Sequence, residues 1–78
     1  LKLKDDPENL DYMHEIAIAL FGNGEIEASF DMFLKSIKID KEWKDQSARK
    51  QLLEFFSSVG FDAKETITAR RKLATLLF

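Results

Sequence analysis

The sequence contains no cysteine, a single proline and a single histidine. Without cysteine, disulfides, thiolate chemistry and cysteine-bound zinc are excluded. His14 alone cannot build a metal site of several histidines, and no acid or nucleophile stands at a spacing that would make it a catalytic base. No apolar run approaches the roughly 18 residues that cross a bilayer. A net charge of −2 gives no general attraction to nucleic acid or anionic membranes. We therefore expect no enzyme, cofactor or metal site, and neither nucleic acid nor membrane as a partner.

What the chain does contain is enough apolar material for one small core. It has 78 residues, of which 45% are hydrophobic and seven are phenylalanine. This composition argues against disorder and fits one domain. The chain begins at Leu1 without methionine, so we expect a piece of a longer protein. Residues 1–6 are interpreted as a linker or the tail of a preceding domain, and residues 7–78 as the helical domain.

The first half of the chain predicts two amphipathic helices joined by a tight turn. The first helix is expected from Pro7 to Phe21, with Asp6 as its N-cap. Residues 22–24, which read Gly-Asn-Gly, interrupt the apolar pattern and form a turn between antiparallel helices. The second helix is expected over residues 25–39, where large apolar residues recur at helical spacing.

The second half predicts another helical pair. The stretch 42–60 has a broad apolar face and is interpreted as the helix around which the others pack, with Asp45 as N-cap and Gly60 as stop. Trp43 then lies in the preceding connection. The last helix is expected from Ala63 to the end of the chain. Its predicted buried residues are Ile67, Leu73, Ala74, Leu77 and Phe78. No strand pattern occurs, so the fold class is all-α, with two antiparallel helical hairpins.

The first hairpin has the residue pattern of a tetratricopeptide repeat. Small residues at two positions would let the helices approach closely, and an aromatic residue would fill the space above them. Ala17 and Ser29 are the close-contact candidates, and Phe33 is the filler. The matching positions are Ala17, Leu20, Gly24, Ile26, Ser29, Phe33, Ser36 and Asp40. The fold is therefore expected to be tetratricopeptide-like.

The whole series from residue 9 to residue 78 resembles a narrower family. Its most specific parts lie between Trp43 and Gly60 and in the run Arg-Arg-Lys-Leu-Ala at residues 70–74. The positions that carry the resemblance are Trp43, Asp45, Ala48, Arg49, Lys50, Leu52, Leu53, Phe56, Gly60, residues 70–74, Leu77 and Phe78. This series is similar to the C-terminal helical domain of bacterial thioredoxin-domain co-chaperones of the YbbN/CnoX type.

The resemblance implies a function that the residues alone do not define. It implies a preceding thioredoxin-like domain, and a cytoplasmic holdase that protects client proteins and passes them to the chaperonin GroEL, partly through its C-terminal helix. The chain has no Cys-x-x-Cys pair, so any redox chemistry would belong to that preceding domain. The alternative is a tetratricopeptide scaffold fragment unrelated to chaperones, in which case further helical repeats would precede Leu1.

Seven residues are candidates for protein binding. On the first helix, Asp11, His14, Ile18 and Phe21 fall at the positions that line the groove of a tetratricopeptide hairpin, where Ile18 and Phe21 would form an apolar patch. The alternative is that these two residues pack on a preceding domain or on a neighbouring chain. The others, near the C-terminus, are Arg70, Arg71 and Phe78. Charged runs such as residues 70–72 are most often solvated helix faces.

Self-association is also left open. Ile18, Met32 and Leu34 are apolar residues beyond those that the predicted core needs. Such a surplus leaves room for contacts between copies of the chain.

Overall fold

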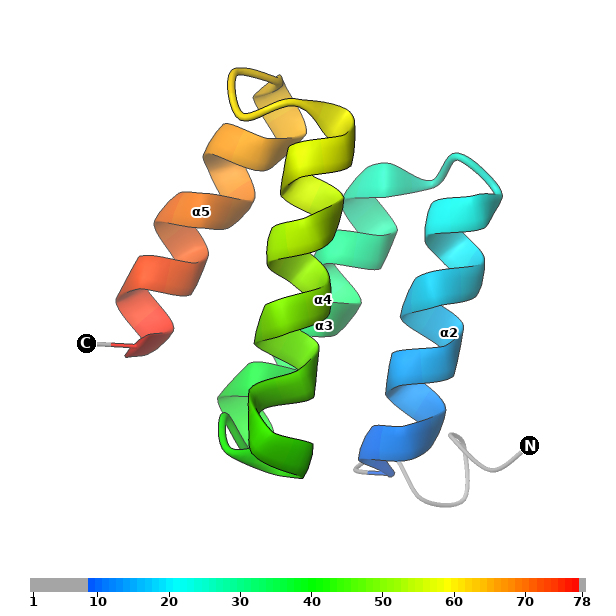
Figure 1. Cartoon of the computed structure of the whole chain (residues 1–78), viewed down its shortest axis with the longest axis vertical. Coiled ribbons are helices and arrows are strands. Elements are labelled where there is room, and N and C mark those ends of the chain that lie inside the picture. The colour runs from blue at the N-terminus through cyan, green and yellow to red at the C-terminus, as the bar shows by residue number, and fades with distance from the viewer. Residues whose placement is uncertain (1–8, 78) are drawn as a thin grey trace.

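The computed structural model describes residues 9–77, which form four α-helices and, within that range, no strand (Figure 1). The helices are α2 (Leu10–Gly22), α3 (Ile26–Ile39), α4 (Trp43–Val59) and α5 (Lys64–Leu77). Successive helices run in opposite directions, so α2 and α3 form one hairpin and α4 and α5 form the second. The predicted all-α class with two antiparallel hairpins is confirmed. The proposed linker, residues 1–6, lies outside the described residues.

Helix α2 begins later than the sequence predicted. Asn9 has an extended backbone and is the N-cap, since its side-chain oxygen accepts a hydrogen bond of 2.9 Å from the backbone N–H of Tyr12. The prediction of one unbroken helix from Pro7 is therefore wrong at its N-terminal end. The predicted opening at Asp6 and Pro7 lies outside the described residues. The short asparagine side chain competes well for the free N–H groups of a first turn, and this determines where α2 begins.

The two small residues predicted to bring α2 and α3 together do so. Ala17 and Ser29 are both fully buried, and the hydroxyl of Ser29 donates a 2.6 Å hydrogen bond to the carbonyl oxygen of Ala17. Phe33, one turn further along α3, is also fully buried. The turn between the helices contains Gly24, whose φ of +83° is a conformation that glycine adopts without strain.

Helix α3 is the element around which the others pack. It contacts α2, α4 and α5, and it runs behind α4 in Figure 1. Its buried residues are Ser29, Phe30, Phe33, Leu34, Ser36 and Ile37. The interpretation of residues 42–60 as the central element is therefore wrong. A helix that packs on three neighbours needs a wide buried face, and α3 has more buried residues than α2, α4 or α5.

The start of α4 differs from the predicted capped helix. Lys44, Asp45 and Gln46 all have positive φ, so the chain makes a left-handed turn inside the helix that Trp43 opens. Asp45 is not the N-cap. Its carboxylate instead accepts a hydrogen bond of 3.1 Å from the Lys50 ammonium, and the Ser47 hydroxyl donates to the carbonyl of Lys44. Asp tolerates the left-handed region better than most residues, which suits it to this turn.

Helix α5 buries a face next to the one that was predicted. Thr66, Ala69 and Leu73 are buried, whereas Ile67 is 39% exposed and Ala74 is also exposed. The prediction is confirmed for Leu73 and wrong for Ile67 and Ala74. Leu77 is half-buried, and Phe78 lies outside the described residues. One side of α5 packs on α3, and Ile67 and Ala74 lie outside that contact.

Candidate protein-binding surfaces

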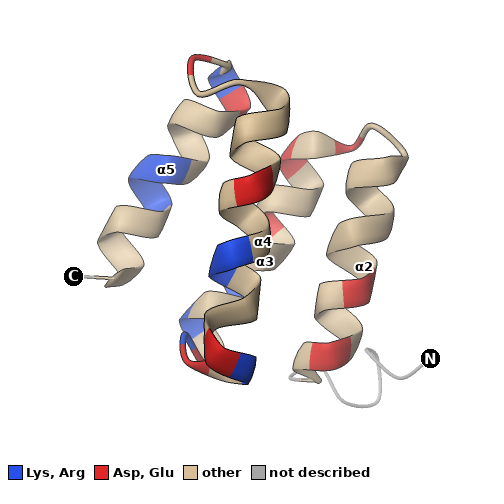
Figure 2. Cartoon of the chain, in the orientation of Figure 1, with Lys and Arg blue, Asp and Glu red and all other residues tan. Residues whose placement is uncertain are grey.

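Three of the four candidate residues on α2 lie at its junction with the other helices. The carboxylate of Asp11 forms an ion pair with the ammonium of Lys44 at the start of α4. Both side chains are largely exposed, so the pair adds little stability but links α2 to α4. Figure 2 shows that α2 carries acidic residues and no Lys or Arg, so Lys44 of α4 lies against an acidic helix.

His14 packs between two aromatic rings. Its imidazole meets the ring of Phe33 edge-on at a centroid distance of 5.5 Å and the indole of Trp43 at 5.3 Å. Burial lowers the pKa of His14 from its usual 6.5, the nearby Lys44 lowers it further, and Asp11 acts in the opposite direction. The neutral form of the His14 imidazole is therefore favoured at this position. Trp43, predicted to lie in a connection, is half-buried in the first turn of α4.

Phe21 also packs inside the domain. Its ring stacks on the ring of Phe55 from α4, with centroids 3.7 Å apart and planes 11° apart. Ile18, in contrast, is 41% exposed. The structure thus separates the predicted apolar patch into two parts. Phe21 joins α2 to α4, and Ile18 is the member that remains available to a partner.

Two of the three C-terminal candidates lie on α5, outside its contact with α3. Arg70 and Arg71 are exposed, and the guanidinium of Arg70 lies 5.9 Å from the ring centroid of Phe61 in the preceding turn. The neighbouring Lys72 pairs with Asp31 of α3, at 3.5 Å. The basic run therefore divides between one lysine that faces α3 and two arginines that face outward. Phe78 lies outside the described residues.

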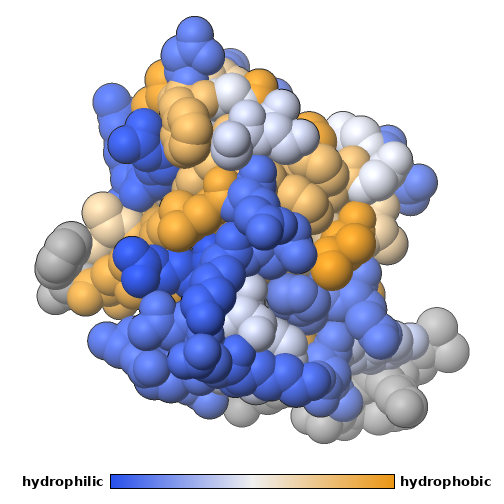
Figure 3. All heavy atoms as spheres, viewed as in Figure 1, coloured by the Kyte–Doolittle hydropathy of each residue, from blue (hydrophilic) through white to orange (hydrophobic). Residues whose placement is uncertain are grey.

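A hollow between α4 and α5 was not predicted. The two helices diverge from the turn at Gly60, and a cavity of about 210 Å³ lies between them. Its lining is largely apolar, with an arginine on each helix. The lining residues are Arg49, Leu53, Phe56, Arg70, Leu73, Ala74 and Leu77. Figure 3 shows hydrophobic surface between these helices on the viewed face. The only signal in the sequence was the excess width of the α4 apolar stripe at Leu53, which is 40% exposed.

A second hollow, between α3 and α5, was not predicted either. Its volume is about 360 Å³. It is lined by Leu34, Lys35, Lys38, Lys72, Thr75 and Leu76. Leu34 was singled out only as a surplus apolar residue, and it is buried here. Because α3 and α5 are separated in the sequence by the whole of α4, no local pattern could place these residues together.

The described residues contain no cluster of metal ligands. No group of three or more His, Cys, Asp or Glu side chains in residues 9–77 could hold a metal ion. Over the same range, no helix has the length and apolar character needed to cross a membrane. The geometry of the described residues is instead that of helices with grooved, partly apolar outer faces.

These features define a class: small all-α domains built from stacked helical hairpins. A family model described as tetratricopeptide repeat matches residues 1–78. The chain belongs to the tetratricopeptide repeat family, and it is a protein–protein interaction module. Searches of curated proteins and of solved structures gave no match.

Proposed function

We propose that this chain is the C-terminal helical domain of a cytoplasmic thioredoxin-like co-chaperone, which holds client proteins and delivers them to the chaperonin GroEL. The observation that carries the proposal is the apolar hollow between α4 and α5, with exposed Leu53 beside it. The resemblance of residues 43–60 and 70–74 to the YbbN/CnoX type supports it. No catalytic step is part of this function.

An open apolar surface suits an unfolded client. Ile18, Leu53 and Ile67 are each about two-fifths exposed, on three different helices. Single exposed apolar side chains are common on protein surfaces, so Leu53, which lines the apolar α4–α5 hollow, is the one of the three that best supports a binding site. Several separate apolar contacts bind exposed hydrophobic segments without requiring one sequence, which is what a holdase needs.

The arginines are proposed as the chaperonin contact. Arg70 and Arg71 project from α5 away from α3, and Arg70 also lines the hollow. Guanidinium groups pair well with carboxylates across an interface. Deleting α5 would be a poor test, since Thr66, Ala69 and Leu73 belong to the core. Substitutions of these exposed arginines leave the core intact and remove the proposed contact, although a change at Arg70 also removes its contact with the Phe61 ring.

Client holding is tested by light scattering of urea-denatured citrate synthase diluted into buffer with the purified chain. The chain should suppress the rise in scattering, and Leu53→Glu should abolish most of that suppression. Ala28→Glu, which adds the same charge at an exposed position of α3, is the matched control and should retain it. Aggregation that is unaffected by the unsubstituted chain would refute the holding role.

Chaperonin binding is tested separately by surface plasmon resonance with immobilised GroEL. Binding should be weakened by Arg70→Glu with Arg71→Glu and unchanged by Lys64→Glu, an exposed lysine in the first turn of α5. Circular dichroism should show that each variant remains helical. The alternative, a scaffold fragment with no chaperone link, is supported by the family match alone, and it predicts neither scattering suppression nor GroEL binding.

A further inference from the structure

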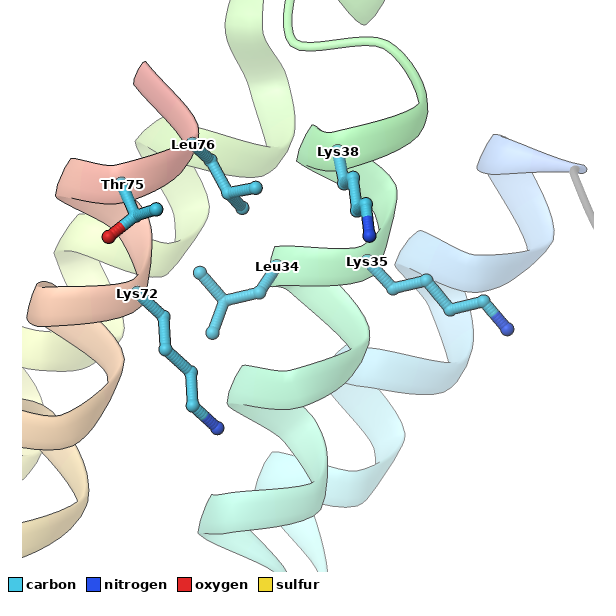
Figure 4. A pocket seen from close by; sticks show the side chains of 6 residues that line it. All are labelled: Leu34, Lys35, Lys38, Lys72, Thr75 and Leu76. Carbon is cyan, nitrogen blue, oxygen red and sulfur yellow. The ribbon is translucent and has the colours of Figure 1, made fainter. Parts of the chain in front are cut away.

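The α3–α5 hollow and the α4–α5 hollow lie on different sides of α5. On α5, residues 70, 73, 74 and 77 line the α4 side, whereas Lys72, Thr75 and Leu76 line the α3 side. Figure 4 shows the α3 side with α4 behind the two helices. A partner seated here would leave the α4–α5 hollow free, so this surface is separate from the proposed client site.

The floor of this hollow is apolar. Leu34 from α3 and Leu76 from α5 extend toward one another from facing helices (Figure 4). The hydroxyl of Thr75 donates a 3.1 Å hydrogen bond to the carbonyl oxygen of Arg71, so its hydrogen-bonding need is met within α5. The volume of about 360 Å³ is large enough for one or two large side chains of a partner.

The rim of the hollow is positively charged. Lys38 and Lys72 extend beside the two leucines from opposite walls, and the ammonium of Lys35 points away on the α3 side. Lys72 has an acidic partner beside the hollow, Asp31, whose carboxylate lies 3.5 Å from the Lys72 ammonium and offsets part of its charge. The lining thus holds three lysines and no acid, on a chain whose net charge is −2. This local excess of positive charge is complementary to carboxylates.

We propose that the α3–α5 hollow binds an acidic segment of a partner protein, with a Leu, Ile or Phe side chain on the leucine floor and flanking Asp or Glu side chains against Lys38 and Lys72. The positively charged rim favours a partner segment with negative charge, and the leucine floor favours an apolar side chain in that segment. Nucleic acid fits less well, because no aromatic side chain lines the hollow for a base to stack on.

The inference rests on the protein-binding role and not on the chaperonin. It would stand if the chain failed to bind GroEL, and it would fall if acidic peptides did not bind while the scattering assay succeeded. Exposed lysine–carboxylate pairs are weak singly and are screened by salt. Binding through this hollow is therefore expected to be weak for a single peptide and to decrease as ionic strength rises.

The test uses fluorescence anisotropy with a fluorescein-labelled peptide that contains two leucines among glutamates, together with versions in which serine replaces leucine or lysine replaces glutamate. The acidic leucine peptide should bind, and both control peptides should not. Lys38→Glu should weaken binding by about tenfold or more, because it turns an attraction into a repulsion. Leu76→Ser should weaken it similarly while the circular dichroism stays helical, since Leu76 is only partly buried.

Lys64→Glu is the matched control, because it makes the same change of net charge at an exposed lysine outside the hollow. Equal losses for Lys38→Glu and Lys64→Glu would overturn the proposal in favour of general charge attraction. Retention of full binding by both Lys38→Glu and Leu76→Ser would also overturn it. So would two other results: binding of phosphatidylserine vesicles that displaces the peptide, or concentration-dependent dimerisation in sedimentation that Lys38→Glu abolishes. The first result would mean that the hollow binds a membrane, and the second that it binds another copy of the chain.

Discussion

The hydroxyl of Ser29 donates a hydrogen bond of 2.6 Å to the carbonyl oxygen of Ala17, across the interface between α2 and α3. Both residues are fully buried. A side chain larger than serine at this place would separate the two helices that the rest of the hairpin requires to be close. The contact thus combines a steric condition with a specific hydrogen bond, and the two can be measured separately.

Ser29→Ala keeps the small size and removes the hydrogen bond, so it should lower the free energy of unfolding by about 1 kcal/mol. Ser29→Leu keeps neither, and should cost about 1–3 kcal/mol more through overpacking. Urea unfolding followed by circular dichroism measures both values. Ser57→Ala, at an exposed position of α4, is the control and should change little. An equal effect of alanine and leucine at position 29 would mean that the close approach does not limit size.

The stacked rings of Phe21 and Phe55 should be energetically coupled. Their centroids lie 3.7 Å apart on different helices, so the contact joins α2 to α4. A double-mutant cycle with Phe21→Leu and Phe55→Leu should give a coupling energy of about 0.5–1.5 kcal/mol. The same cycle with Phe21→Leu and Phe61→Leu should give none, since Phe61 is exposed in the turn before α5. Additive effects in the first cycle would contradict the stacked arrangement.

His14 should make stability depend on pH. Burial lowers its pKa below 6.5 in the folded chain, whereas the unfolded chain keeps the ordinary value of about 6.5. Between these two pKa values the unfolded state binds more protons. The free energy of unfolding should therefore fall as the pH drops below about 6.5, and this group should add no slope well above that pH. Urea unfolding across this range should show a weaker slope for His14→Gln. Identical slopes for the two proteins would refute this role.

Gly60 should tolerate alanine poorly. Its φ of +115° is unfavourable for any residue with a side chain, and an added Cβ would lie 3.3 Å from a carboxylate oxygen of Asp62. Gly60→Ala should therefore lower the free energy of unfolding by about 1–3 kcal/mol. Gly22→Ala is the contrast, because Gly22 ends α2 with no positive φ and with open space around it. Thermal melts should show Gly22→Ala to be neutral or stabilising, and the opposite order would contradict the geometry.

Local rules predicted the helices and turns well, and failed where two local signals competed. The glycines at 22, 24 and 60 were correctly read as ends and turns, because their conformational freedom is a local property. At Asp45 the sequence offered a capping residue, but the chain uses it in a left-handed turn that a lysine partner supports. On α5, apolar residues form two adjacent stripes, and periodicity could not show which of them would face α3.

The candidate surfaces were harder to predict than the fold. The four candidate residues of the first helix all lie on α2, but their neighbours depend on how α4 crosses it, which periodicity does not encode. His14 and Phe21 found aromatic partners on α4, and Ile18 did not. Both hollows beside α5 arise from helices that diverge or that are distant in the sequence. Their lining residues could be recognised only once the helices had been placed.

The position of α3 also bears on how the chain folds. Since α5 docks on a helix that precedes it by the whole length of α4, the second hairpin has little stabilising contact of its own. A fragment carrying only the last two helices should stay largely unstructured in water. Thermal unfolding should be a single cooperative transition, because α5 has little support once α3 has unfolded.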